Sequence, residues 1–246
     1  MTSTPPTPDV SAELPDRFEG LLSWPRVIAL VAAVAFLAGV IGYRIGQPDD
    51  PNLNEVDIGF LADMSTHHEG ALGLAFAYLP SADDSVIRQI AGEIIRTQSI
   101  EINFMTVLLQ QSNDERVDEV VSDNIAMEWM GDPTIPDRMP GMATVADLDE
   151  LRATSGVEAD DLFTRLMIDH HAAGAEMADY EAAHGREDQV RNAARSMATY
   201  QRAEIAELNI RREALGLEPY KPTADAHSGA HAASRRLPLR DPTSRA

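Results

Sequence analysis

Two histidine doublets separated by 103 residues constrain the fold of this chain more than any other feature. The doublets are His67–His68 and His170–His171, and the whole chain contains only 7 histidines. The same register holds without a gap in the aligned pairs Asp57 and Asp160, Phe60 and Phe163, Met64 and Met167, Gln98 and Gln201, and Glu101 and Glu204. A repeat at a fixed offset indicates that one supersecondary unit has been duplicated.

Each repeat has the pattern of a helical hairpin. Apolar residues recur at helical spacing from about Asp57 to Pro80, from a cap at Ser81 and Asp84 to about Gln111, from about Glu158 to His184, and from about Glu187 to Leu215. A short helix capped by Thr144 and Asp147 is expected before the third of these. A hairpin cannot bury its apolar stripe alone, so the two should pack together. We predict an all-α, four-helix bundle over residues 47–220, divided into repeat A (56–111), a connection (112–156) and repeat B (157–216).

An uncharged stretch precedes the bundle and predicts a membrane anchor. Residues 27–43 read VIALVAAVAFLAGVIGY, with Arg26 and Arg44 on either side and Trp24 and Tyr43 at interfacial positions. We expect an uncleaved transmembrane signal anchor over residues 24–46, after a disordered tail (1–23). A cleaved signal peptide and a buried soluble helix are the alternatives. Basic residues before the span favour a single-pass protein of the cell membrane with its bundle on the extracytoplasmic side, followed by a disordered tail (221–246).

Composition excludes several classes of function. The chain has 40 acidic and 20 basic side chains and a net charge of −20, which argues against nucleic acid as a partner. It contains no cysteine, so disulfides, thiolate metal sites and thiol catalysis are excluded. No nucleophile–base arrangement or phosphate-binding glycine loop is present, and we expect a protein that is not an enzyme.

The repeated polar residues are expected inside the bundle. At 100° per residue, both histidines of each doublet flank the centre of their helix's apolar stripe, and Gln98, Glu101, Gln201 and Glu204 share the inward face of the other helices. Burying such groups without partners costs several kcal/mol each, on the order of 2–7. They must therefore hydrogen-bond one another, with Glu101 and Glu204 accepting from imidazoles and the glutamines completing the remaining bonds, or bind a ligand.

A metal ion is the ligand that this set of side chains suits. The candidate ligands are His67, His68, His170, His171, Met64, Met167, Met177, Glu101 and Glu204. Imidazole binds copper, zinc, nickel and iron, whereas thioether sulfur selects Cu(I), so copper is the favoured metal. A di-iron centre is the rival, but two inward carboxylates are too few for it. Met127, Met130, Met139 and Met142 in the connection either form a further thioether site or pack beneath the loop.

These motifs resemble a known bacterial family. FLADMSTHHEGALGLA, the Q-x-x-E-I steps and MPGMATVADLDELRATSGVEADDLFTRLMIDHHAAGAEMA are similar to the family of domains of unknown function numbered 305, over about residues 56–216. The resemblance implies a ferritin-like four-helix fold, export or membrane anchoring, and in members of the CopM type a periplasmic copper-binding role in copper resistance. Its motif falls on Met64, His67, His68, Gln98 and Glu101 and on their counterparts in repeat B. The second methionine expected after the first doublet is Leu74 here.

Two functions therefore remain open. The first is a membrane-anchored, extracytoplasmic metal-binding protein, with copper as the metal, in metal homeostasis or resistance. The second is a non-catalytic interaction module or accessory subunit of a membrane complex, in which the His, Glu and Gln core is structural. The partners considered are a metal ion, the membrane through the N-terminal helix, and a membrane protein or a second copy of the chain.

Overall fold

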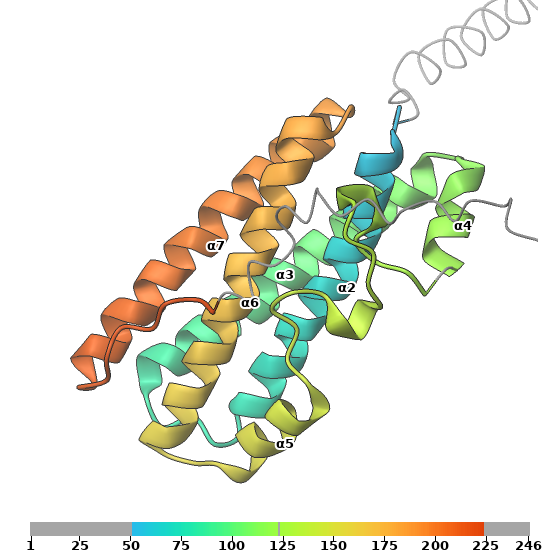
Figure 1. Ribbon diagram of the computed structural model, residues 1–246. Coiled ribbons are helices and arrows are strands. Elements are labelled where there is room, and N and C mark those ends of the chain that lie inside the picture. The colour runs from blue at the N-terminus through green and yellow to red at the C-terminus, as the bar shows by residue number, and fades with distance from the viewer. Residues whose placement is uncertain (1–50, 123, 224–246) are drawn as a thin grey trace, which may run out of the picture. The chain divides into compact units, whose positions relative to one another are not determined.

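The computed structural model describes residues 51–122 and 124–223, and within these ranges the chain is all-α (Figure 1). The N-terminal tail (1–23), the transmembrane anchor (24–46) and residues 224–246 of the C-terminal tail, all three predicted from sequence, lie outside the described residues. No helix in the described ranges combines the length and apolar character that a membrane span requires.

Four long helices form two antiparallel hairpins. Helix α2 (Glu55–Tyr78) pairs with α3 (Ser85–Gln111), and α6 (Val157–His184) pairs with α7 (Asp188–Ala214). The hairpins meet mainly where α2 packs against α6, and Figure 1 shows these two helices at the centre of the bundle. All four agree with the predicted stretches to within a few residues. The predicted cap at Ser81 is wrong: Asp84 caps α3 by accepting from the N–H groups of Val86 and Ile87.

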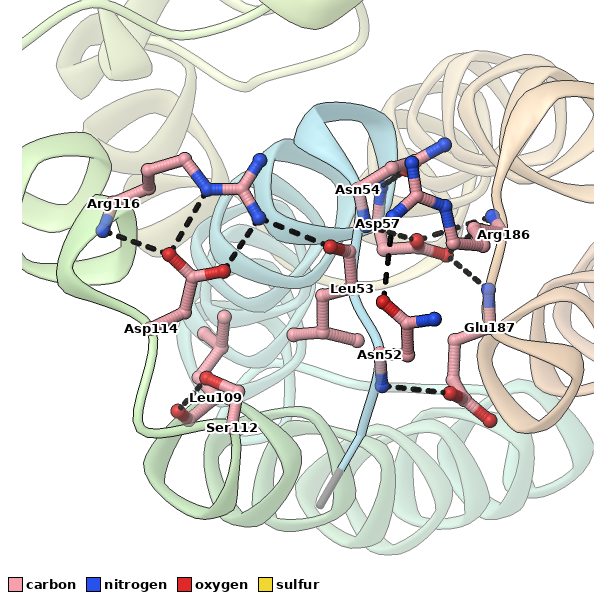
Figure 2. Close-up of polar contacts among 10 residues, drawn as sticks. All are labelled: Asn52, Leu53, Asn54, Asp57, Leu109, Ser112, Asp114, Arg116, Arg186 and Glu187. Carbon is pink, nitrogen blue, oxygen red and sulfur yellow. Dashed lines mark hydrogen bonds and ion pairs between the residues drawn. The ribbon is translucent and has the colours of Figure 1, made fainter. Parts of the chain in front are cut away.

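Two buried aspartates join the hairpins, because each accepts hydrogen bonds from the turn within the other hairpin. Asp57, at the start of α2, accepts hydrogen bonds from the backbone N–H groups of Arg186 and Glu187, just before α7 (Figure 2). Asp160, at the start of α6, accepts from the backbone N–H groups of Asp83 and Asp84, just before α3. The accepting aspartate and the two donating residues of one cap are separated from their counterparts in the other cap by the same number of residues as the histidine doublets. The start of each central helix therefore lies beside the end of the other, so α2 and α6 are antiparallel.

The described residues of the connection between the hairpins pack along α2. It contains α4 (Glu115–Ser122), two 3₁₀ turns (Glu128–Met130 and Pro136–Arg138) and α5 (Val145–Ala153). The Thr144–Asp147 capping box predicted for α5 is confirmed, whereas α4 was not predicted. Asp63 of α2 holds the connection in place, because its Oδ2 accepts hydrogen bonds from Met127 N and Trp129 Nε1, each at 2.7 Å.

The apolar core is divided into two clusters by a polar layer. One cluster gathers the N-terminal half of α2, the C-terminal half of α3, the C-terminal half of α6 and the N-terminal half of α7. The other cluster gathers the opposite halves of the same helices. Between the clusters lie both histidine doublets, on α2 and α6, and the two glutamine–glutamate steps, on α3 and α7. The position of this layer, at mid-height in the bundle, defines the candidate site.

Candidate metal centre

All four histidines of the doublets are buried. The exposed fraction is 0% for His67, His68 and His171 and 1% for His170. His67 and His170 stack across the α2–α6 interface, with ring centroids 3.9 Å apart and an angle of 22° between the ring planes. The doublets therefore point into the shared interior, as the helical periodicity predicts.

The outer pair of imidazoles faces the glutamates of the flanking helices. His68 Nε2 hydrogen-bonds Glu101 Oε2 at 2.8 Å. His171 Nε2 lies 2.9 Å from Glu204 Oε2, within ion-pair distance but outside the direction of a hydrogen bond. The glutamates are only about one-fifth exposed, with fractions of 20% and 23%. The prediction that the glutamates accept hydrogen bonds from imidazoles is confirmed for Glu101, whereas Glu204 lies beside His171 without such a bond.

The inner pair of imidazoles is held by backbone carbonyls of the connection. His67 Nε2 donates to Pro140 O at 3.1 Å, and His170 Nδ1 donates to Gly141 O at 3.2 Å. Gly141 has a φ of +75°, and a Cβ at this position would lie 2.8 Å from Asp169 O and from His170 Cα. Glycine is therefore required for the segment Met139–Met142 to approach α6 this closely.

Each imidazole has at least one ring nitrogen without a hydrogen-bond partner among the described residues, and His171 has two. His67 Nδ1, His68 Nδ1, His170 Nε2 and His171 Nδ1 are buried and make no hydrogen bond to the described residues. A neutral imidazole that donates through one nitrogen presents a lone pair on the other. In metal sites, ligating histidines donate their second N–H to a carboxylate or a carbonyl in this way, which fixes the ring and the tautomer.

Burial keeps the stacked histidines neutral. Loss of solvent lowers the pKa of His67 to about 3, with the neighbouring His68 adding to the effect. The pKa of His170 is lowered well below its usual value by burial, and then by the positive charge that His67 would carry. Because only the neutral ring has a lone pair for a metal, both side chains are in the ligating form at neutral pH.

The glutamines do not complete the network as predicted. Gln98 and Gln201 are buried, but their Oε1 atoms have no hydrogen-bond partner among the described residues. The imidazoles donate to carbonyl and carboxylate oxygens instead, which leaves the amide oxygens unused. Gln201 packs against α6 at Gly174, where a Cβ would collide with its carboxamide.

The methionine thioethers are not divided equally between the two sides of the histidine layer. Met64, Met167 and Met177 are all buried, at 0%, 0% and 1% exposure. Met64 and Met177 belong to the first apolar cluster, together with most of the chain's other methionines, whereas Met167 is in the second. Met142 Sδ and His170 Cε1 both lie against Gly70, so one thioether of the connection reaches the layer.

The donors do not form a closed site of hard ligands. Among the described residues, no three His, Asp or Glu side chains gather closely enough to hold a metal ion. The donors present in and beside the layer are imidazole nitrogens and thioether sulfurs, and of these imidazole suits several transition metals whereas thioether suits Cu(I).

Several residues of the histidine layer and of the α2–α6 interface were not found from the sequence. Pro140 and Gly141 act through backbone oxygens, which carry no side-chain signal. Tyr78, whose hydroxyl donates to Asp160 Oδ1 at 2.5 Å, and Glu181, which occupies the equivalent place beside Asp57, form the two ends of the α2–α6 interface. Tyr78 and Glu181 occupy equivalent positions in the two repeats, and this exchange of one polar residue for another is the signal in the sequence that could have identified them.

Two helical hairpins that enclose a buried imidazole layer define the class of protein. Within that class, the chain belongs to the family described as Domain of unknown function (DUF305), whose model matches residues 57–211. The resemblance stated from the sequence is thereby confirmed.

Two solved structures of proteins from this family agree with the assignment. A family member from Streptomyces coelicolor, presumed to be secreted, is 29% identical, with a TM-score of 0.60 over 68% of this chain and 97% of that one. A fragment from Deinococcus radiodurans is 26% identical, with a TM-score of 0.55 over 68% and 99%. CopM in its Cu(I)-bound form is 24% identical, with a TM-score of 0.48 over 65% and 96%. The comparison with curated proteins gave no match.

Proposed function

We propose that this protein is a non-catalytic metal-binding protein whose histidine layer takes up copper as Cu(I), in metal homeostasis or resistance. The observation that carries the proposal is the state of the four imidazoles: three of them hydrogen-bond a carbonyl or carboxylate oxygen through one nitrogen, His171 lies beside Glu204, and every ring has a buried nitrogen without a partner. Leaving four such acceptors unsatisfied is costly, and a metal ion would use them.

The donor set favours Cu(I) over harder ions. His67, His68, His170 and His171 would supply imidazole nitrogen, and Met64, Met167 and Met177 would supply thioether sulfur. Glu101 and Glu204 would act as hydrogen-bond partners that orient the rings, not as direct ligands, because they already face His68 and His171. Soft thioethers beside neutral imidazoles, without cysteine, select Cu(I) when bound.

The test is metal uptake by the full chain purified in mild detergent. We expect Cu(I) binding in competition with a chromogenic chelator, and loss of binding when all four histidines of the doublets are changed to Ala. His184→Ala is the matched control, because His184 lies on the same helix as His170 but is exposed. Unchanged uptake in the fourfold variant would remove the proposal.

Conservative variants keep the test informative if the fourfold variant does not fold. Met64→Leu, Met167→Leu and Met177→Leu preserve volume and remove sulfur, so each should fold, with a cost in stability below about 1.5 kcal/mol. We expect weaker Cu(I) binding and little change in Zn(II) binding, because zinc in proteins is held by His, Cys and carboxylate ligands and not by thioethers.

The stacked rings of His67 and His170 favour a second candidate, the accessory module with a structural core. Rings that already pack against each other and donate to backbone carbonyls could hold the hairpins together without an ion. This candidate predicts that the chain isolated from its native membrane contains no copper by elemental analysis and retains a protein partner.

We also propose that the bundle is ferritin-like, arose by duplication and is presented outside the cytoplasm by an N-terminal membrane anchor. The shared offset of the swapped aspartate caps supports duplication. The presumed secretion of the relative from Streptomyces coelicolor and the uncharged stretch at residues 27–43 support the location. Protease added to intact cells should degrade the bundle, and protection from it would contradict the assignment.

A further inference from the structure

A cavity of about 620 Å³ lies away from the histidine layer, between α2, the end of α3 and α4. Its apolar walls include Leu109 of α3, Val117 and Val120 of α4, and Ile125 of the connection. This volume is in the range of sites that hold small organic molecules, roughly 300–1,000 Å³. The histidines and methionines proposed as metal ligands are not among its lining residues.

All charged side chains of the described residues that line this cavity are acidic. Four acidic residues line it, Asp63, Asp114, Glu115 and Asp118, and no Lys, Arg or His does so among the described residues. Asp114 is paired with Arg116, which points away toward the start of α2. The remaining carboxylates give the cavity an excess of negative charge beside apolar walls, and such a combination is complementary to a cation that carries an apolar body.

One of these carboxylates is part of the cavity floor and is not free to move. Asp63 is only 8% exposed, and its Oδ2 is fixed by Met127 N and Trp129 Nε1. Its Oδ1 accepts no hydrogen bond from the described residues.

A second, smaller cavity of about 370 Å³ shares Asp63, Val120 and Ile125 with the first. The indole of Trp129 lines this smaller space. An aromatic face beside a buried carboxylate is a favourable surface for an ammonium group or for the apolar part of an amine. The two cavities therefore place apolar and anionic groups on both sides of Asp63, and the smaller one adds the indole of Trp129 and the guanidinium of Arg116.

Helix α4, which forms the outer wall of the larger cavity, is fixed to the bundle. The larger cavity is therefore preformed. Arg116, in the first turn of α4, donates to Leu53 O at 3.0 Å and to the carboxylate of Asp114 (Figure 2). These bonds attach α4 to the segment that leads into α2. A preformed site loses less conformational entropy on binding than one that must be assembled.

We propose that this cavity binds a small organic cation, a primary amine with an apolar body, whose ammonium group pairs with Asp63 Oδ1. The apolar part lies against Leu109, Val117 and Val120. The site is separate from the histidine layer, and amine binding does not require copper.

The test uses the full chain in mild detergent and three probes of equal shape. 4-Phenylbutylamine is the cation, 4-phenylbutanol the neutral control and 4-phenylbutanoate the anionic control, each titrated with ligand-detected NMR. We expect the amine to bind at least about tenfold more tightly than the alcohol, and the acid to bind least. Equal binding of the three probes, or no binding of the amine, would overturn the proposal.

Two variants locate the site. Asp63→Asn keeps an oxygen acceptor for Met127 N and Trp129 Nε1 but removes the charge, and it should weaken amine binding about tenfold or more. Val121→Lys places a cation at the rim, where the side chain is 63% exposed and tolerant of change, and should also weaken binding. Val145→Lys, at a 76% exposed position on α5, is the matched control and should bind like the parent. Folded variants of Asp63 and Val121 that bind the amine unchanged would refute the assignment.

Discussion

At the scale of single residues, the site depends on how each imidazole is oriented. The inward position of His67 and His170 follows from helical period, and the contact of His68 with Glu101 follows from two inward faces on paired helices. The bonds to Pro140 O and Gly141 O could not be predicted, because every residue has a backbone carbonyl. The sequence therefore predicted the histidine layer but not the segment Met139–Met142 that covers it.

Gly141 offers a direct test of that covering segment. Gly141→Ala combines an unfavourable positive φ with a collision against the α6 backbone, whereas Gly131→Ala has the same φ problem in open space. We expect Gly131→Ala to cost about 1 kcal/mol in unfolding free energy. Gly141→Ala should cost about 1–3 kcal/mol more. Urea unfolding of both variants measures the difference, and equal losses would show that the segment is not closely packed on α6.

Glu181 gives the molecule a dependence of stability on pH. Burial, followed by the negative charge of the nearby Asp57, raises the Glu181 pKa to about 8, and Arg191 only partly offsets this. The folded state thus holds a proton that the unfolded state releases near the usual glutamate pKa of 4.5. The contribution of Glu181 to stability must therefore decrease as pH rises from about 4.5 to about 8, by at most about 1.4 kcal/mol per pH unit.

The Glu181→Gln variant is the control for this effect. It keeps a hydrogen-bond donor beside Asp57 and cannot ionise, so its unfolding free energy should change less across that pH window. Chemical unfolding of both chains at a series of pH values measures the two slopes. Identical slopes would mean that Glu181 is ionised in the folded protein.

At the scale of helices, the swapped aspartate caps set the relative position of the hairpins. The alignment of Asp57 with Asp160 was visible in the sequence, but their partners were not, because each cap crosses to the other hairpin. The long helices were predictable from many periods of apolar residues. Helix α4 was missed because eight residues with two partly buried valines give too short a pattern.

Removing one of these caps should weaken the whole bundle. Asp160 is fully buried and accepts bonds from Tyr78 Oη and from the backbone at Asp83 and Asp84. Asp160→Ala leaves these donors without an acceptor, so we expect a loss of about 2–4 kcal/mol. Asp149→Ala, which removes an exposed ion pair with Arg152, should change stability by less than about 1 kcal/mol. Thermal and urea unfolding distinguish the two, and similar losses would contradict the capping role.

At the scale of the molecule, the fold is nearly symmetric whereas the donor set is not. The imidazoles, glutamates and aspartate caps all repeat at one offset. The position equivalent to Met177 is Leu74, and both side chains are buried next to the histidine layer, each in a different apolar cluster. If the histidine layer binds Cu(I), repeat B therefore supplies more thioether donors than repeat A.

This asymmetry predicts opposite effects of two volume-conserving changes on binding of Cu(I). Met177→Leu should weaken it by removing a thioether, and Leu74→Met should strengthen it by supplying one at the equivalent position, while each costs less than about 1.5 kcal/mol in the metal-free chain. Because binding to the folded state alone raises stability, Cu(I) at a hundredfold excess over its Kd should stabilise the parent by about 2.7 kcal/mol. At the same Cu(I) concentration the gain should be smaller for Met177→Leu and larger for Leu74→Met. Melting curves with and without Cu(I) provide the measurement, and equal gains in all three chains would show that these thioether positions do not contribute to the site.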